Sequence, residues 1–183
     1  MNGVSSAPVN ISLSSSAPGV FTLNQSGQGH GAILHGSNFS LVTSANPAQR
    51  GEVIALFATG LGTVFPTVET GSAATSDPLS TSLPENIPNV TIGGVPATVQ
   101  FSGLAPCFIG VYQINIAVPA DAPIGELDLV LTSSGHSSNP VKLPVGSGPI
   151  AQQMDNQQNV GSFFLKNSSC SVQNSLTSST GTG

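Results

Sequence analysis

Serine, histidine and acidic side chains, the three types that combine in hydrolytic triads, all occur in this chain of 183 residues. In one large class of hydrolases the nucleophilic serine sits on a sharp turn between a strand and a helix, which a Gly-x-Ser-x-Gly motif marks. The sequence contains neither that motif nor a convincing helix pattern. We therefore predict that the protein is not an enzyme.

Histidines and acids are also common metal ligands. His30 and His35 lie five residues apart, and on a strand this spacing points the side chains to opposite faces, which disfavours a shared metal ion. We expect both histidines at the surface or in loops. Asp121, Glu126 and Asp128 lie near one turn and could form a weak calcium site, but acids on the solvent face of a strand give the same pattern. The residues thus predict no metal ion and no cofactor.

Two cysteines, Cys107 and Cys170, are the only ones in the chain. In a protein of extracellular composition, two thiols favour one disulfide bond between them. The alternative is two unpaired cysteines that lie too far apart to bond. A bridge would close a loop of about 63 residues, attach the C-terminal part of the chain to the preceding domain, and stabilise the fold by a few kcal/mol in the entropic model.

The composition restricts the partners and the environment of the protein. Charged residues make up 6% of the chain, against about 25% in ordinary soluble proteins. Only three residues are Lys or Arg and the net charge is −5, which argues against nucleic acid and anionic membranes as partners. No apolar run is long enough to span a bilayer, so we expect no membrane insertion. Neutral hydroxyl and amide side chains replace the missing charges, a composition typical of extracellular or cell-surface proteins.

Short alternating segments predict strands throughout the body of the chain. About seven of them, joined by turns such as Gly93-Gly94 and with no helices, predict an all-β fold, an immunoglobulin-like antiparallel β-sandwich. Residues 66–88 form a long loop, which often marks a binding surface or an irregular edge. Period-two spacing places the following residues in the core: Ile54, Leu56, Ile92, Val99, Ile114, Ile116, Leu127, Leu129 and Leu131.

One phrase occurs twice. Gly-Val-Ser-Ser-Ala-Pro-Val at residues 3–9 reappears as Gly-His-Ser-Ser-Asn-Pro-Val at 135–141, an offset of 132 residues (135 − 3). Each copy runs into an alternating segment, 10–13 after the first and 142–145 after the second. We therefore predict that the chain opens on the closing strand of one β domain and then contains a related domain. This divides it into a strand segment (1–16), an immunoglobulin-like β domain (17–146) and a Ser/Thr/Gly/Asn-rich extension with one further strand (147–183).

Several phrases resemble a known family. They are Ala-Pro-Gly-Val-Phe (17–21), Arg-Gly-Glu-Val-Ile-Ala-Leu-Phe-Ala-Thr-Gly-Leu-Gly (50–62), Val-Thr-Ile-Gly-Gly-Val-Pro-Ala (90–97), Ser-Gly-Leu-Ala-Pro (102–106) and Tyr-Gln-Ile-Asn-Ile-Ala-Val-Pro (112–119). Together they resemble the uncharacterised C-terminal domain of secreted Acidobacteria proteins, the Solibacter type. From Gly51 onward the chain is also similar to IPT/TIG immunoglobulin-like domains. The resemblance implies an extracellular β module without known enzymatic activity. Cys107 departs from it, standing where the family pattern has Gly, and the chain from about Ala151 lies outside it.

These features predict a non-catalytic, extracellular structural or adhesive module, a subunit of a surface appendage or filament assembled by strand addition. Its expected partners are other copies of itself or neighbouring immunoglobulin-like domains. The alternative is an accessory domain of a larger secreted protein, for example a carbohydrate-binding one. The chain has no Trp and one Tyr, which disfavours that alternative because sugars usually stack on exposed aromatic rings. The candidate residues for strand exchange are Val4, Val9, Ile11, Leu13, Phe163 and Leu165.

Overall fold

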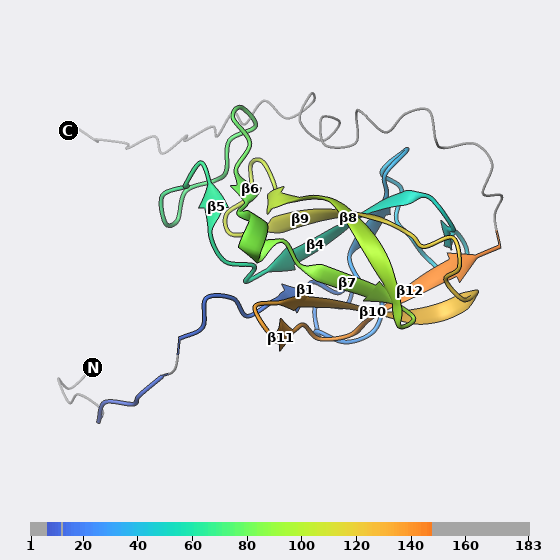
Figure 1. Cartoon of the computed structure of the whole chain (residues 1–183), viewed down its shortest axis with the longest axis horizontal. Coiled ribbons are helices and arrows are strands. Elements are labelled where there is room, and N and C mark those ends of the chain that lie inside the picture. The colour runs from blue at the N-terminus through green and yellow to red at the C-terminus, as the bar shows by residue number, and fades with distance from the viewer. Residues whose placement is uncertain (1–6, 12, 148–183) are drawn as a thin grey trace, which may run out of the picture.

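The computed structural model describes residues 7–11 and 13–147, and this part of the chain is all-β, as predicted (Figure 1). Its only helical element is a 3-10 turn, η1 (Pro84–Asn86). The strands are β1 (Gly19–Val20), β2 (Ile33–His35), β3 (Ala48–Gln49), β4 (Val53–Thr59), β5 (Val64–Phe65), β6 (Thr81–Ser82), β7 (Asn89–Ile92), β8 (Val95–Leu104), β9 (Tyr112–Ala117), β10 (Gly125–Ser133), β11 (His136–Ser137) and β12 (Val141–Gly146).

The strands form one strongly curled sheet, with the main order β1-β4-β9-β8-β7-β10-β12-β3. The curl passes through β8, which is long enough to belong to both halves. Its first residues pair with β7, its later residues pair with β9, and the register shifts between Val99 and Phe101. Such an irregularity bends a strand and increases its twist. The sheet is therefore a half-barrel whose two halves stay joined through β8.

The core fills the concave side of this curled sheet. Seven of the nine predicted core residues are fully buried, and the other two, Val99 and Leu127, are partly buried against the same cluster. The cluster combines residues of β4 and β9 from one half with residues of β7, β10 and β12 from the other. The Gly93-Gly94 turn between β7 and β8 is also confirmed, with φ values of 58° and 81° that favour glycine.

One strand pair departs from the predicted antiparallel arrangement. β3 pairs with β12 in parallel, with Ala48 opposite Val145 and Gln49 opposite Gly146. The described sheet is consequently mixed. The sequence around Asn46 and Pro47 reads as a turn, and a strand of two residues is too short to show a period-two pattern.

Candidate strand-exchange site

β12 is the closing strand of the described fold, and it lies between β10 and β3. Its apolar side chains at alternate positions are buried: Val141 and Leu143 are 0% exposed and Val145 is 3% exposed. On the opposite face, Lys142 forms a surface ion pair with Asp128, with 2.8 Å between Nζ and Oδ1. β12 thus presents one apolar face to the core, and its other face carries a charged side chain at the surface.

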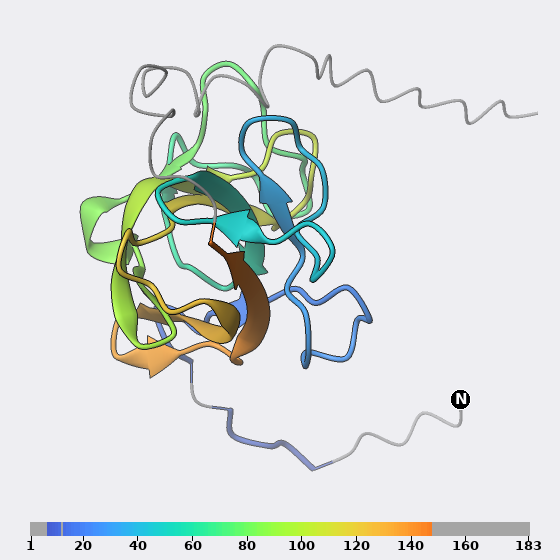
Figure 2. The ribbon, with the colours of Figure 1, turned by 90° about the vertical axis from the view of Figure 1, so that its right-hand side faces the viewer.

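The N-terminal segment repeats the alternating apolar pattern of β12 but not its environment. The offset of 132 residues matches Val9, Ile11 and Leu13 to the three buried residues of β12. In the structure these side chains are 81%, 79% and 94% exposed, respectively. None of residues 7–11 and 13 belongs to a strand, and in Figures 1 and 2 they extend away from the body. The described part of the segment thus has the apolar alternation of the closing strand but lies outside the sheet.

The segment separates from the domain at Ser16. The Ser16 hydroxyl donates to the Ser133 carbonyl oxygen over 3.0 Å, and the Ala17 amide donates to the Gly60 carbonyl oxygen over 2.8 Å. Gly60 has a φ of 75°, and a Cβ there would lie 2.1 Å from the Ala17 oxygen, so only glycine fits. These contacts fix the chain where the predicted boundary between segment and domain falls, and the exposed apolar residues before them remain accessible for pairing elsewhere.

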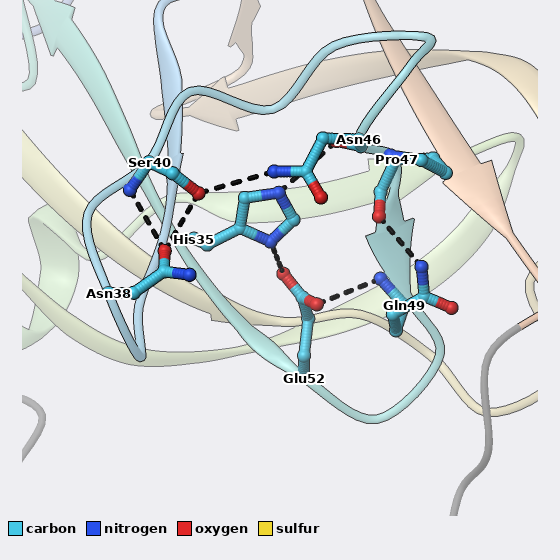
Figure 3. A network of polar contacts seen from close by, with 7 residues as sticks. All are labelled: His35, Asn38, Ser40, Asn46, Pro47, Gln49 and Glu52. Carbon is cyan, nitrogen blue, oxygen red and sulfur yellow. Dashed lines mark hydrogen bonds and ion pairs between the residues drawn. The ribbon is translucent and has the colours of Figure 1, made fainter.

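β3, the second neighbour of β12, is held by a buried polar network (Figure 3). His35 Nδ1 lies 2.8 Å from Glu52 Oε1, and His35 Nε2 lies 3.2 Å from the Asn46 carbonyl oxygen. The other Glu52 oxygen accepts the Gln49 amide over 2.9 Å. The network joins the end of β2 to both ends of the 46–52 segment that contains β3. It therefore positions one wall of the place that β12 occupies.

The same network corrects one prediction: His35 is buried, not a surface or loop histidine. Burial also raises the pKa of Glu52, although the Gln49 amide and His35 act in the opposite direction. Both ring nitrogens of His35 face oxygen atoms, Nδ1 that of the Glu52 carboxyl group and Nε2 the Asn46 backbone carbonyl.

Among the other candidate ligands, His30, Glu126 and Asp128 make polar contacts at the surface, and Asp121 is exposed. Glu126 accepts a hydrogen bond from the Ser44 hydroxyl at 3.0 Å and contacts His30 Nε2 at 3.1 Å, and Asp128 pairs with Lys142. Within residues 7–11 and 13–147, no three His, Cys, Asp or Glu side chains gather as a metal-binding group. Across the same part of the chain, no helix has the length and apolar character needed to cross a membrane.

Four candidate residues lie outside the described part of the chain: Val4, Phe163, Leu165 and Cys170. Cys107 is described, in the turn after β8, with a φ of 68°, a backbone conformation that glycine adopts more easily than other residues. Cys107 is not a free thiol, but its pairing with Cys170 stays a prediction.

No family model matches the chain, and a search of curated proteins finds no relative.

Proposed function

We propose that this protein is a non-catalytic structural or adhesive module that works outside the cell and joins its neighbours by strand addition. The observation that supports this most directly is the occurrence of one pattern in two opposite environments: Val9, Ile11 and Leu13 are exposed, whereas their counterparts in β12 are buried. The composition, poor in charge and rich in neutral polar residues, and the resemblance to domains of secreted proteins support the extracellular setting.

The repeat specifies how the donated strand would lie. In a related module, residues 7–14 would take the place of β12, antiparallel to the strand equivalent to β10 and parallel to that equivalent to β3. Ile11 would then stand opposite the counterpart of Leu127, as Leu143 does here. In a second copy of this chain the place is already filled, so pairing between copies requires an exchange of closing strands.

A comparison of free energies indicates whether association is tight or depends on protein concentration. Burying one exposed Val, Ile or Leu contributes about 1.5–3 kcal/mol, so Val9, Ile11 and Leu13 together contribute roughly 5–9 kcal/mol. Association of two free molecules costs about 4–15 kcal/mol in lost freedom. The two are comparable where the acceptor place is empty, so pairing with such a separate module depends on concentration. In an exchange between two finished copies, the burial that the segment gains offsets the burial that the displaced Val141, Leu143 and Val145 lose. Pairing with a module linked in the same polypeptide avoids most of that cost, because the linker raises the effective concentration.

The proposal is tested by the assembly of the full-length protein over a wide concentration range. Light scattering should show association that rises with concentration, and electron microscopy should show open filaments, because head-to-tail contacts do not close unless their rotation allows it. Serine in place of Val9, Ile11 and Leu13 together should return the protein to monomers. The matched control, Asn10→Ser, changes the other face of the segment and should assemble like the wild type.

A photo-crosslinking amino acid at position 11 locates the acceptor. The expected adducts join two chains and map to β10 and β3, the neighbours of β12. Adducts elsewhere, or a wild-type protein that stays monomeric at high concentration, reject strand addition. In the monomeric case the accessory-domain alternative takes its place.

A further inference from the structure

A cavity of about 440 Å³ opens at the end of the molecule that contains β5 and β6. The start of β5, the 67–72 loop and the turn between β8 and β9 surround it. Its buried apolar lining is Val64, Leu104 and Tyr112, and Val68 adds a partly buried wall. The cavity is thus an apolar hollow outside the proposed strand-exchange site.

The surface beside this hollow is apolar as well. Ile109, which lines it, is 62% exposed, and its neighbour in sequence, Phe108, is 52% exposed. Apolar side chains that gather at a hollow usually mark a binding surface. Glu69 is the single charged residue in the lining, and it is exposed. A matching occupant is therefore a short apolar segment with one basic residue at its end.

The chain itself contains such a segment beyond β12. Phe163, Phe164 and Leu165 are consecutive and are followed by Lys166, the only Lys or Arg outside the described part of the chain. Cys170 comes four residues after Lys166. Cys107, the other cysteine, is two residues before Ile109. A disulfide between the two cysteines would therefore anchor this apolar segment beside the hollow.

Chain length permits the connection. The end of β12 and the end of the molecule with β5 and β6 lie on opposite sides of the body in Figure 1. A body of about 130 residues has a radius of gyration of about 14 Å. The stretch from residue 147 to residue 163 reaches about 53–58 Å when extended, and that from residue 165 to residue 170 about 17 Å. Both distances suffice for the segment to reach the hollow while the disulfide forms.

We propose that residues 163–166 dock in the hollow of the same molecule, with the apolar side chains against Val64, Leu104 and Ile109 and with Lys166 facing Glu69. The predicted Cys107–Cys170 disulfide fastens this contact. The extension then covers its own apolar residues, and the N-terminal segment is left as the strand donor. This leaves Phe163 and Leu165 with an intramolecular role instead of the strand exchange expected from the sequence.

The test is methyl-resolved NMR on the oxidised full-length protein, kept dilute enough to be monomeric. Aromatic rings in the hollow should give nuclear Overhauser contacts from Phe163 or Phe164 to the methyl groups of Ile109, Leu104 or Val64. Replacing Phe163, Phe164 and Leu165 by serine should abolish these contacts and shift the same methyl signals. The control Val172→Ser/Leu176→Ser changes apolar residues beyond Cys170 and should leave the signals unchanged.

Three outcomes overturn the proposal. One is the absence of contacts between these rings and the hollow. Another is a set of hollow methyl signals that respond equally to both variants. The third is a set of contacts that appear only between chains in a mixture of labelled and unlabelled protein. Amide exchange of residues 104–112 gives an independent measure, with an acceleration of about threefold or more expected in the serine variant, since docking should protect these amides from local opening. Both measurements report on contacts within one molecule, so their outcome does not depend on whether the N-terminal segment pairs with another sheet.

Discussion

The closing strand and the N-terminal segment have the same pattern and opposite environments. In β12, Leu143 lies opposite Leu127 of β10 and is fully buried, whereas Ile11, at the corresponding place in the segment, is exposed. Alternation of apolar residues specifies which face of a strand will be buried. Burial itself requires a sheet with an empty place beside it. The alternating pattern of the N-terminal segment therefore specifies a strand, whereas the sheet that would bury this strand is specified by residues elsewhere.

The two copies also differ at a residue that locks β12 in place. Asn139, just before β12, uses its side-chain amide like a strand neighbour for Val20: the Val20 amide donates to Oδ1 over 2.8 Å, and Nδ2 donates to the Val20 carbonyl over 3.0 Å. Nδ2 also donates to the Gly27 carbonyl over 2.8 Å. The corresponding residue in the first copy is Ala7, whose side chain has no polar group. The first copy therefore lacks this second attachment.

The largest predicted effect comes from making the same kind of change in both copies. Leu143→Ala should lower the free energy of unfolding by about 2–5 kcal/mol, because it leaves a cavity in the core. Ile11→Ala should change it by less than about 0.5 kcal/mol in the monomer, because that side chain is exposed. Urea unfolding at low protein concentration measures both. Equal losses would show that the segment is packed in the single chain.

A smaller loss is expected when the lock is removed. Asn139→Ala should cost about 1–3 kcal/mol, because it leaves partly buried backbone groups of Val20 and Gly27 without partners. The reciprocal change, Ala7→Asn, should have no effect on the monomer. Thermal unfolding of both variants is the measurement. A stable Asn139→Ala protein would mean that β12 needs no side-chain clamp.

The network that positions β3 predicts a dependence on pH. The pKa of Glu52 is raised above the ordinary value of 4.5 by burial, so folding favours its protonated form. The resulting contribution of Glu52 to the free energy of unfolding is fully present below pH 4.5. It is lost as the pH rises through the pKa of Glu52 in the folded state. The stability of the wild type relative to Glu52→Gln should therefore fall as the pH increases from 4.5. Urea unfolding at several pH values measures it, with the exposed Glu85→Gln as control, and an unchanged difference contradicts the assignment.

The smallest effect is expected at position 142, where the two copies differ in a side chain at the surface. Lys142→Asn converts this position of β12 into its counterpart in the first copy, Asn10. The ion pair with Asp128 is exposed, and such pairs contribute little. The unfolding midpoint should not change measurably. A clear loss would show that the polar face of β12 also specifies its place, and that Asn10 makes the first copy a weaker strand.

The part of the fold that could be predicted from the sequence is the part that depends on spacing along one strand. Residues such as Ile54 and Leu129 are assigned to the core because alternation survives in any sheet. The pairing of Glu52 with His35 is not predictable in this way, because the two are 17 residues apart and only the pairing of β2 with β4 brings them together.

The period-two pattern also does not predict that both faces of β9 are buried. Period-two spacing places Gln113 and Asn115 on the face of β9 opposite Ile114, yet both are buried as well, and Gln113 Nε2 donates a hydrogen bond of 2.8 Å to Asn115 Oδ1. Alternation tells on which side a residue lies, not what covers that side. Only the repeat indicated that the N-terminal segment is an additional strand without a pairing partner in the domain. No local feature of a sequence distinguishes an unpaired strand from a paired one.

The parallel pairing of β3 with β12 has a consequence for the order of events during synthesis. Ala48 and Val145 meet across 97 residues of chain (145 − 48), and contacts of such long range form late. β12 is the last of the described strands to leave the ribosome, so the gap between β10 and β3 is the last part of this sheet to close. Under the proposed strand addition, a nascent domain would offer this gap to residues 7–14 of a neighbour, whereas a finished domain offers an occupied one. Exchange between copies would then depend on how fast each domain closes, and slow folding at high local concentration would favour longer assemblies.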